Sequence, residues 1–321
     1  MPAARILFVK LSSLGDVVHH LPAVSDLVER RPDVEVLWAV EGPYVDLVRL
    51  HRGVREAIGV DLRALRRAPW SVSRWSSLAA ARRALARAGA ERVIDAQGLI
   101  KSAMVARMAR APVFGFDRAS AREPFATRFY DVKLAVPRQL HAVERNRRLV
   151  ARVFGYEAEG APRYGLAAPE APPSWAPADR YVVLLHAASR VDKRWSDANW
   201  IELARRLRAN GFTPVFPGGS EAERARAARL AAAVGGAMAA PAMPLAEAAA
   251  LLAHAHGVVG VDTGLTHLAV AFGVPTVGVY CATDPALTGL HGGERAINIG
   301  GRGAAPAVEA VAQAIGLEAA A

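Results

Sequence analysis

The chain has 321 residues, 52% of them apolar and 22% charged, with a formal net charge of +10 and a mean hydropathy of +0.15. This composition can fill a large core, which excludes a disordered chain, and the length suggests two domains. The single cysteine, Cys281, excludes a disulfide framework and a cysteine-built metal site. No signal peptide or membrane-spanning run is visible, so we expect a soluble, cytoplasmic protein.

The positive charge is concentrated in the first half of the chain. Residues 1–165 hold 28 Lys and Arg against 17 Asp and Glu, whereas residues 166–321 hold 12 against 13. This asymmetry favours an anionic partner for the first half: nucleic acid, an anionic membrane surface or a phosphorylated substrate. A compositional bias toward arginine is the plainer alternative, because the chain has only four lysines.

Short apolar runs alternate with helical patterns in the first half. Strands are expected at Arg5–Val9, Glu35–Val40 and Arg92–Asp95. The apolar positions from Val17 to Val28 have helical spacing and predict one helix, and the arginine-rich segment Asp61–Arg87 is expected to be mostly helical. Such alternation indicates an α/β fold with a mainly parallel sheet.

A proline-rich segment, Ala158–Asp179, separates the two halves and predicts a linker. The alternation then resumes, with Ser196 as a candidate N-cap and strands expected at Tyr181–Leu185, Phe212–Phe216, Val258–Val261 and Val274–Tyr280. We therefore expect two Rossmann-like domains, residues 1–165 and 166–321, that face an inter-domain cleft. The C-terminal helix could pack back on the first domain.

Three loops that follow strands in the second half are rich in small residues: Ala187–Ser189, Gly218–Ser220 and Asp262–Thr266. Small residues let the backbone approach a ligand, and the helix that follows offers free N–H groups to an anion. Each loop alone could be a simple turn, but together with Lys193 they predict a nucleotide-diphosphate pocket. Neither a P-loop nor a dinucleotide fingerprint occurs, which disfavours a dehydrogenase.

Asp16 ends a Ser/Gly loop at the start of a helix. It could cap that helix, or it could act as a general base that removes a hydroxyl proton. His19, His20 and His267 have the same ambiguity between a structural and a functional role. The stretch from Arg63 to Trp75 mixes arginine with tryptophan, which suits phosphate or a membrane interface as well as a solvated helix. No standard nucleic-acid-binding motif is present.

Six motifs spread over nearly the whole chain form a recognisable set: Lys10–Asp16, Asp95–Ser102, Ala121–Pro124, His141–Arg145, Asp192–Trp195 and Val261–Leu268. Together they resemble the lipopolysaccharide heptosyltransferases, glycosyltransferases of the ADP-heptose family with the GT-B fold. The last motif is shared across that family. Ala96–Ser102 and Ala121–Pro124 are similar to the type I members.

The resemblance implies inverting transfer of L-glycero-D-manno-heptose from ADP-heptose to a Kdo residue of Kdo2-lipid A, in lipopolysaccharide inner-core synthesis. It implies Asp16 as the catalytic base, with Ser13, Gly15, Lys101 and Arg122 at the anionic acceptor. The residues implied at the donor are Ala188, Ser189, Lys193, Glu223, Met243, Asp262, Thr263, Gly264, Leu265 and His267.

Within that donor set, Glu223 would bind the ribose and Met243 would pack near the adenine. The family pattern has threonine at positions 188 and 189, whereas this chain has Ala188 and Ser189. We therefore expect one hydroxyl contact to the diphosphate to be missing here.

The resemblance further implies that no cofactor or metal is required, and the sequence contains no DxD pair. The expected partners are ADP-L-glycero-D-manno-heptose, Kdo2-lipid A and an anionic membrane surface, and nucleic acid is not expected. The protein would be cytoplasmic and peripheral on the inner membrane. Two alternatives stay open: a type II enzyme that acts on an already heptosylated core, and a non-enzymatic polyanion-binding protein.

Overall fold

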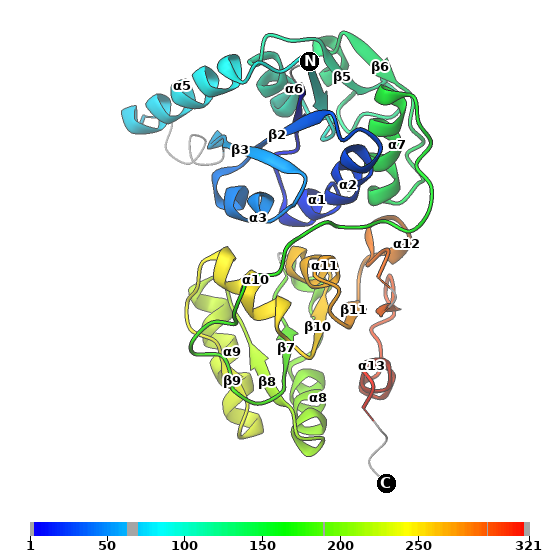
Figure 1. Cartoon of the computed structure of the whole chain (residues 1–321). Coiled ribbons are helices and arrows are strands. Elements are labelled where there is room, and N and C mark those ends of the chain that lie inside the picture. Colours follow the sequence, from blue (N-terminus) through cyan, green and yellow to red (C-terminus); the bar gives the residue numbers. More distant parts are fainter. Residues whose placement is uncertain (1–2, 63–69, 189, 294, 318–321) are drawn as a thin grey trace. The chain divides into compact units, whose positions relative to one another are not determined.

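The computed structural model describes residues 3–62, 70–188, 190–293 and 295–317. The chain divides after Ala167 into two compact units, Met1–Ala167 and Ala168–Ala321. Each unit contains a parallel six-stranded sheet with helices packed on it (Figure 1). This is the α/β architecture of two Rossmann-like folds that the sequence predicted.

The sheet of the first unit has the strand order β3-β2-β1-β4-β5-β6. Its strands are β1 (Ala4–Val9), β2 (Val34–Val40), β3 (Val54–Gly59), β4 (Arg92–Asp95), β5 (Val113–Phe116) and β6 (Val132–Leu134). The helices are α1 (Leu14–Val18), α2 (Leu21–Arg30), α3 (Val45–Arg49), α5 (Val72–Arg87), α6 (Ile100–Arg107) and α7 (Ala142–Phe154), with short 3-10 helices η1 (Gly42–Tyr44) and η2 (Pro124–Phe129). The order reverses between β1 and β4, where folds of this kind bind ligands at the carboxyl edge.

The second unit repeats this topology with the order β12-β11-β10-β7-β8-β9. Its strands are β7 (Tyr181–Leu185), β8 (Thr213–Phe216), β9 (Met238–Ala239), β10 (Gly257–Val261), β11 (Thr276–Tyr280) and β12 (Ala296–Gly300). The helices are η3 (Val191–Lys193), α8 (Asp197–Ala209), α9 (Glu221–Val234), α10 (Leu245–Ala253), α11 (Gly264–Ala271), α12 (Pro285–Thr288) and α13 (Val308–Ala314). The reversal lies between β7 and β10, so the loops after these strands meet at one edge.

The single helix predicted from Val17 to Val28 is wrong, because α1 ends at Val18 and α2 begins at Leu21. Pro22 stands in the first turn of α2. A proline has no backbone N–H to donate, and its ring clashes with the carbonyl four residues earlier, here that of Val18. The same residue is well tolerated in a first turn, so the chain breaks and restarts there.

Helices cover both faces of the first sheet. Helices α5 and α6 share one apolar core with the strands, in which Leu85 and Ala103 pack with Leu7 and Leu37. Helix α7 packs against α2, β5 and β6. Helix α5 contacts β3, the strand at one edge of the sheet (Figure 1). The arginine-rich helix expected within Asp61–Arg87 therefore exists as α5, although residues 63–69 lie outside the described part of the chain.

The apolar core of the second unit contains Trp195 and Trp200, which are 1% and 0% exposed. Their rings meet edge to face with 5.1 Å between the ring centroids. Such aromatic pairs add to the stabilisation that apolar burial provides. The C-terminal helix α13 packs on α8 and on strands β11 and β12 of this unit. None of the helices that the structure describes is long and apolar enough to cross a membrane.

Candidate functional site

The first group of candidate residues lies at the carboxyl ends of β1 and β4. Val9 pairs with Asp95, so the loop that leads to Asp16 begins beside the loop that leads to Lys101. Ser13 is the N-cap of α1, and its backbone N–H donates to Asp16 Oδ2 at 3.0 Å. Asp16 therefore does support the start of this helix, as the structural interpretation expected, but its other contacts go further.

Arg122 forms an ion pair with Asp16. The distance from Arg122 Nη2 to Asp16 Oδ1 is 3.1 Å, and the Asp16 side chain is only 18% exposed. Burial alone would raise the pKa of Asp16, but the charges of Lys10 and Arg122 and the Ser13 N–H outweigh it and lower that pKa. The carboxylate is thus held ionised and accepts hydrogen bonds from two directions.

Lys101 lies in the first turn of α6, and its Nζ donates to Ser12 Oγ at 3.4 Å. Gly15 lies in α1 next to Asp16. The structure therefore brings all five residues predicted for the first half into the neighbouring loops and helix starts of one sheet edge: Ser13, Gly15, Asp16, Lys101 and Arg122.

Beneath this surface lies a buried polar layer that the sequence-based site did not include. Lys10 is 5% exposed, and its Nζ donates to Ala96 O at 2.8 Å and to Asn146 Oδ1 at 3.3 Å. Burial lowers the pKa of Lys10 to about 8, although the charge of Asp16 opposes that shift. In the sequence, Lys10 is one of only four lysines and begins the Lys10–Asp16 motif, but neither fact shows that its ammonium is buried.

Gln97 holds the loop between β1 and α1. Its Oε1 accepts from the backbone N–H of Leu11 at 2.7 Å and of Ser12 at 3.4 Å. Asp95 in turn accepts from the Gln97 N–H at 2.9 Å, and Tyr130 donates its hydroxyl to Asp95 at 2.7 Å. Burial raises the pKa of Asp95 despite these hydrogen bonds. The network fixes the backbone that carries Asp16.

The second group of residues surrounds Asp262 at the end of β10. Lys193 Nζ donates to Asp262 Oδ2 at 2.6 Å, and Thr283 Oγ1 donates to the same oxygen at 2.9 Å. His267 Nε2 lies 3.8 Å from Asp262 Oδ1. Burial would raise the pKa of Asp262, but His267 and Lys193 hold it well below its usual range. Sequence analysis predicted the other members of this group but missed Thr283, which lies beyond the quoted motifs.

Helix α11 begins beside this carboxylate. Thr263 is its N-cap and Gly264 and Leu265 are its first two residues. The first N–H groups of a helix have no intrahelical partner, and the helix dipole places partial positive charge there. The Lys193 ammonium and the first N–H groups of this helix thus lie around the Asp262 carboxylate, and both are groups that bind a diphosphate.

The remaining donor candidates are placed less directly. Glu223 Oε2 accepts from the N–H groups of Gly219 and Ser220, both at 2.9 Å, so this carboxylate caps α9. Ala188 is buried in the apolar core, and Met243 is half-buried between β9 and α10. No hydrogen bond or ion pair in the described part of the chain joins Glu223 or Met243 to the Asp262 group. Ser189 lies outside the described residues.

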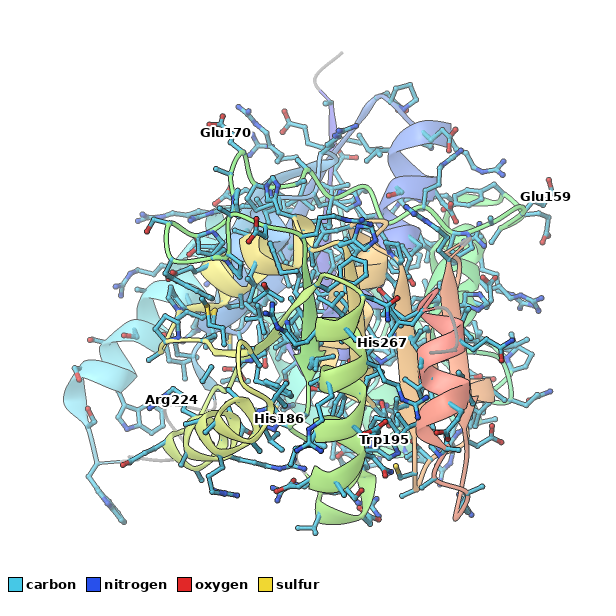
Figure 2. All side chains as sticks on the ribbon, turned by 90° about the horizontal axis from the view of Figure 1, so that it is seen from below. Glu159, Glu170, His186, Trp195, Arg224 and His267 are labelled. Carbon is cyan, nitrogen blue, oxygen red and sulfur yellow. The ribbon has the colours of Figure 1, made fainter. Side chains whose placement is uncertain are left out.

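Arg226 holds the loop that carries Lys193, a role that sequence analysis missed. Its guanidinium donates to His186 O at 2.6 Å and to Trp195 O at 3.1 Å, the two ends of that loop. Arg224, also from α9, donates to Gly219 O at 3.0 Å. Figure 2 labels His186, Trp195, Arg224 and His267 among the side chains of this unit. Among the residues that the structure describes, no three His, Cys, Asp or Glu side chains gather as a metal site.

Comparison with known proteins places the chain in a family. The profile of Glycosyltransferase family 9 (heptosyltransferase) matches residues 78–315. Lipopolysaccharide heptosyltransferase 1 of Pseudomonas aeruginosa is 41% identical over 297 residues, which cover 90% of this chain and 81% of the relative.

Solved structures agree with this result. E. coli heptosyltransferase WaaC with ADP is 37% identical, has a TM-score of 0.88, and the match covers 96% of this chain and 98% of the other. The same enzyme with ADP-2-deoxy-2-fluoro heptose is 36% identical with a TM-score of 0.84, over 96% and 98% of the two chains. E. coli ADP-heptose lps heptosyltransferase II has a TM-score of 0.75 over 97% of each chain but only 18% identity, which shows a shared fold alone. The chain belongs to glycosyltransferase family 9, the heptosyltransferase family, and is a glycosyltransferase with the GT-B fold that the sequence predicted.

Proposed function

We propose that this glycosyltransferase transfers L-glycero-D-manno-heptose from ADP-heptose to a Kdo residue of Kdo2-lipid A, with inversion at the anomeric carbon. The observation that carries the proposal is the ionised carboxylate of Asp16 beside Arg122, at the carboxyl edge of a sheet. The 41% identity to a lipopolysaccharide heptosyltransferase 1 over 90% of the chain supports the choice of donor and acceptor.

In the proposed reaction Asp16 accepts the proton of the attacking Kdo hydroxyl. That oxygen forms a bond to the anomeric carbon of heptose while the bond from this carbon to the ADP oxygen breaks, and ADP leaves with the electron pair. A single displacement of this kind inverts the anomeric centre. General-base catalysis of this type typically contributes about 10²–10⁴-fold to the rate.

The acceptor side of the proposal rests on charge. Arg122 and Lys101 would meet the carboxylate and phosphate groups of Kdo2-lipid A, with Ser13 and Gly15 at the attacking sugar. Residues 1–165 carry the whole excess of positive charge, which favours an anionic substrate for this half. The first unit would therefore bind the acceptor, at the cytoplasmic face of the inner membrane, and no nucleic acid is involved.

The donor side rests on the second unit. Lys193 and the N–H groups at the start of α11 would stabilise the charge that develops on the departing diphosphate. His267 would lie at the donor with Asp262, which is ionised and would keep Lys193 charged and oriented until the diphosphate arrives. Glu223 would bind the ribose through the carboxylate oxygen that does not cap α9, and Met243 would pack near the adenine. Position 188 offers no hydroxyl, and Ser189 would supply the remaining one.

A direct assay tests the proposal. ADP release from ADP-heptose should require Kdo2-lipid A and should not occur with the acceptor that already carries the first heptose. The anomeric configuration of the product should be opposite to that of the donor. Turnover of the heptosylated acceptor alone would indicate the type II reaction, and retention of configuration would exclude the single displacement. Membership of a glycosyltransferase family leaves no support for the non-enzymatic alternative.

A further inference from the structure

Helix α5 and the residues that follow α6 border a groove that belongs to neither group of candidate residues. The groove has a volume of about 530 Å³. Its apolar wall consists of Trp75, Leu78 and Ala86 from α5 together with Met108, which follows α6. Together with Arg82, these α5 positions recur every three or four residues, so they form one stripe along the helix. The groove is thus a surface that one helix side and one helix end build together.

Three arginines line the same groove: Arg82, Arg83 and Arg110. Their guanidinium groups have no hydrogen bond or ion pair with any residue that the structure describes. Arg107, one helix turn away from Arg110, has such a partner, because its Nη1 lies 2.7 Å from Asp131 Oδ2. The sequence contains no Asp or Glu from Leu62 to Ala90, so α5 supplies no carboxylate of its own. Three exposed like charges around one groove therefore favour an anionic ligand there.

The backbone of Arg110 adds an independent observation. Arg110 has φ of 58°, the only positive value for a residue other than glycine in the described ranges. Left-handed backbone at the end of a helix is normally taken by glycine, because a side chain is unfavourable there. An arginine at this position thus carries a conformational cost, and its side chain lines the groove. Residues that bear such strain concentrate at functional surfaces.

Two tryptophans, Trp70 and Trp75, lie at the N-terminal end of α5. Trp75 is 54% exposed although it lines the groove, and Trp70, just before the helix, is 90% exposed. Tryptophan is enriched where proteins meet the interface between lipid headgroups and hydrocarbon, and arginines in its company contact lipid phosphates. Exposed tryptophan, an aliphatic wall and exposed guanidinium groups together match an amphipathic anionic partner.

We propose that the α5 groove, formed by Trp75, Leu78, Ala86 and Met108 and bordered by Arg82, Arg83 and Arg110, docks the protein on the anionic headgroups of a lipid bilayer. The guanidinium groups bind lipid phosphates, while Trp75 and the aliphatic wall contact the acyl chains just below. This inference rests on the proposed function, because a bilayer is where Kdo2-lipid A is presented. A bilayer is favoured over nucleic acid, because strand binding uses a series of aromatic side chains for base stacking and the groove wall has one.

Binding to vesicles tests this proposal without any substrate. The full chain is sedimented with vesicles of phosphatidylcholine mixed with phosphatidylglycerol, and with vesicles of phosphatidylcholine alone. We expect binding to the anionic vesicles only, weakened by salt. The double variant Arg82→Gln/Arg83→Gln keeps helix propensity and should reduce the partition coefficient roughly 25-fold, since each basic residue near the surface contributes about 5-fold.

Two further variants separate docking from unfolding and from charge alone. Arg110→Gly removes the guanidinium and relieves the backbone, so it should weaken vesicle binding about 5-fold while the melting temperature stays equal or rises. The matched control is Arg148→Gln/Arg152→Gln, which removes two exposed arginines from α7 on the same unit. This control should change binding less than 2-fold. An equal loss in the control and in the α5 variant would overturn the proposal.

A second readout distinguishes this inference from the proposed function. ADP release is measured with a soluble Kdo acceptor that lacks acyl chains and with Kdo2-lipid A embedded in anionic vesicles. The α5 variant should retain the first activity and lose the second. Turnover of the soluble acceptor without vesicle binding by the natural chain would refute the docking groove and leave the function standing. Binding to single-stranded RNA, lost in the α5 variant, with no binding to vesicles would also refute it.

Discussion

Replacement of Asp16 by asparagine isolates the proton-accepting role of this carboxylate. The asparagine Oδ1 can still accept from the Ser13 N–H, which lies 3.0 Å from the carboxylate, so the start of α1 keeps its cap. The variant loses the charge and the ion pair with Arg122, whose side chain is 45% exposed. With the Asp16 side chain 18% exposed, the pair is half-buried, so its loss should lower the free energy of unfolding by about 1 kcal/mol, the upper end of the range for solvent-exposed pairs.

The expected effect on catalysis is much larger. Loss of a general base lowers kcat by about 10²–10⁴-fold, which corresponds to roughly 3–5 kcal/mol of transition-state stabilisation. ADP affinity should stay within about 2-fold, because the residues proposed to hold the diphosphate belong to the second unit, around Lys193 and Asp262. The split between kcat and donor affinity is therefore the signature of a base.

Single-turnover ADP release and calorimetric ADP titration measure these two quantities on the same preparations. Asp46→Asn is the matched control, since it removes one carboxylate from an exposed ion pair with Arg49 in the same unit. The control should keep kcat within about 2-fold. If Asp16→Asn kept more than about a tenth of the natural kcat, the base assignment would be refuted.

Three other expectations follow from charges in the two units. Arg122→Gln removes a cation that lowers the pKa of Asp16, so the acid limb of kcat/KM should move to higher pH; a limb that does not move would contradict the coupling. Lys193→Gln should raise the Kd for ADP about 10–100-fold in calorimetry, because the variant loses a charge-assisted hydrogen bond and leaves Asp262 unneutralised. An unchanged Kd would exclude Lys193 from the diphosphate site. Lys10 has a pKa of about 8 in the folded protein and an ordinary value of 10.5, so the folded state loses this proton at a lower pH than the unfolded chain does. The free energy of unfolding should therefore rise as pH rises above 8, by up to about 1.4 kcal/mol per pH unit. Lys10→Met should remove that rise in urea unfolding measured from pH 7 to 9.5, and an identical pH slope in the variant would show that Lys10 is not the source.

Apolar runs in the sequence were enough to predict seven strands and the residue types of the loops, whereas β3, β5, β6, β9 and β12 were not predicted. Apolar runs such as Tyr181–Leu185 became strands as predicted, because a short run that is rich in valine and has an aromatic residue favours a strand buried on both faces. Residue types also predicted an anionic ligand, since a lysine and a run of small residues before a helix suit a diphosphate when the fold brings them together. The helix break before Pro22 follows from the missing N–H of proline, although the apolar spacing alone predicts one continuous helix.

Which charges meet and which are buried depends on the fold of each whole unit. Lys193 and Asp262 are 69 positions apart in sequence and in contact, because β7 and β10 are neighbours in the sheet although two strands separate them along the chain. Strand order of this kind is set by the packing of the whole unit, and the local sequence pattern does not predict it. The burial of Lys10 beneath Asp16 also results from packing of the whole unit. The sequence shows that residue 10 is a lysine, but the pKa of that lysine depends on the atoms that exclude water from it.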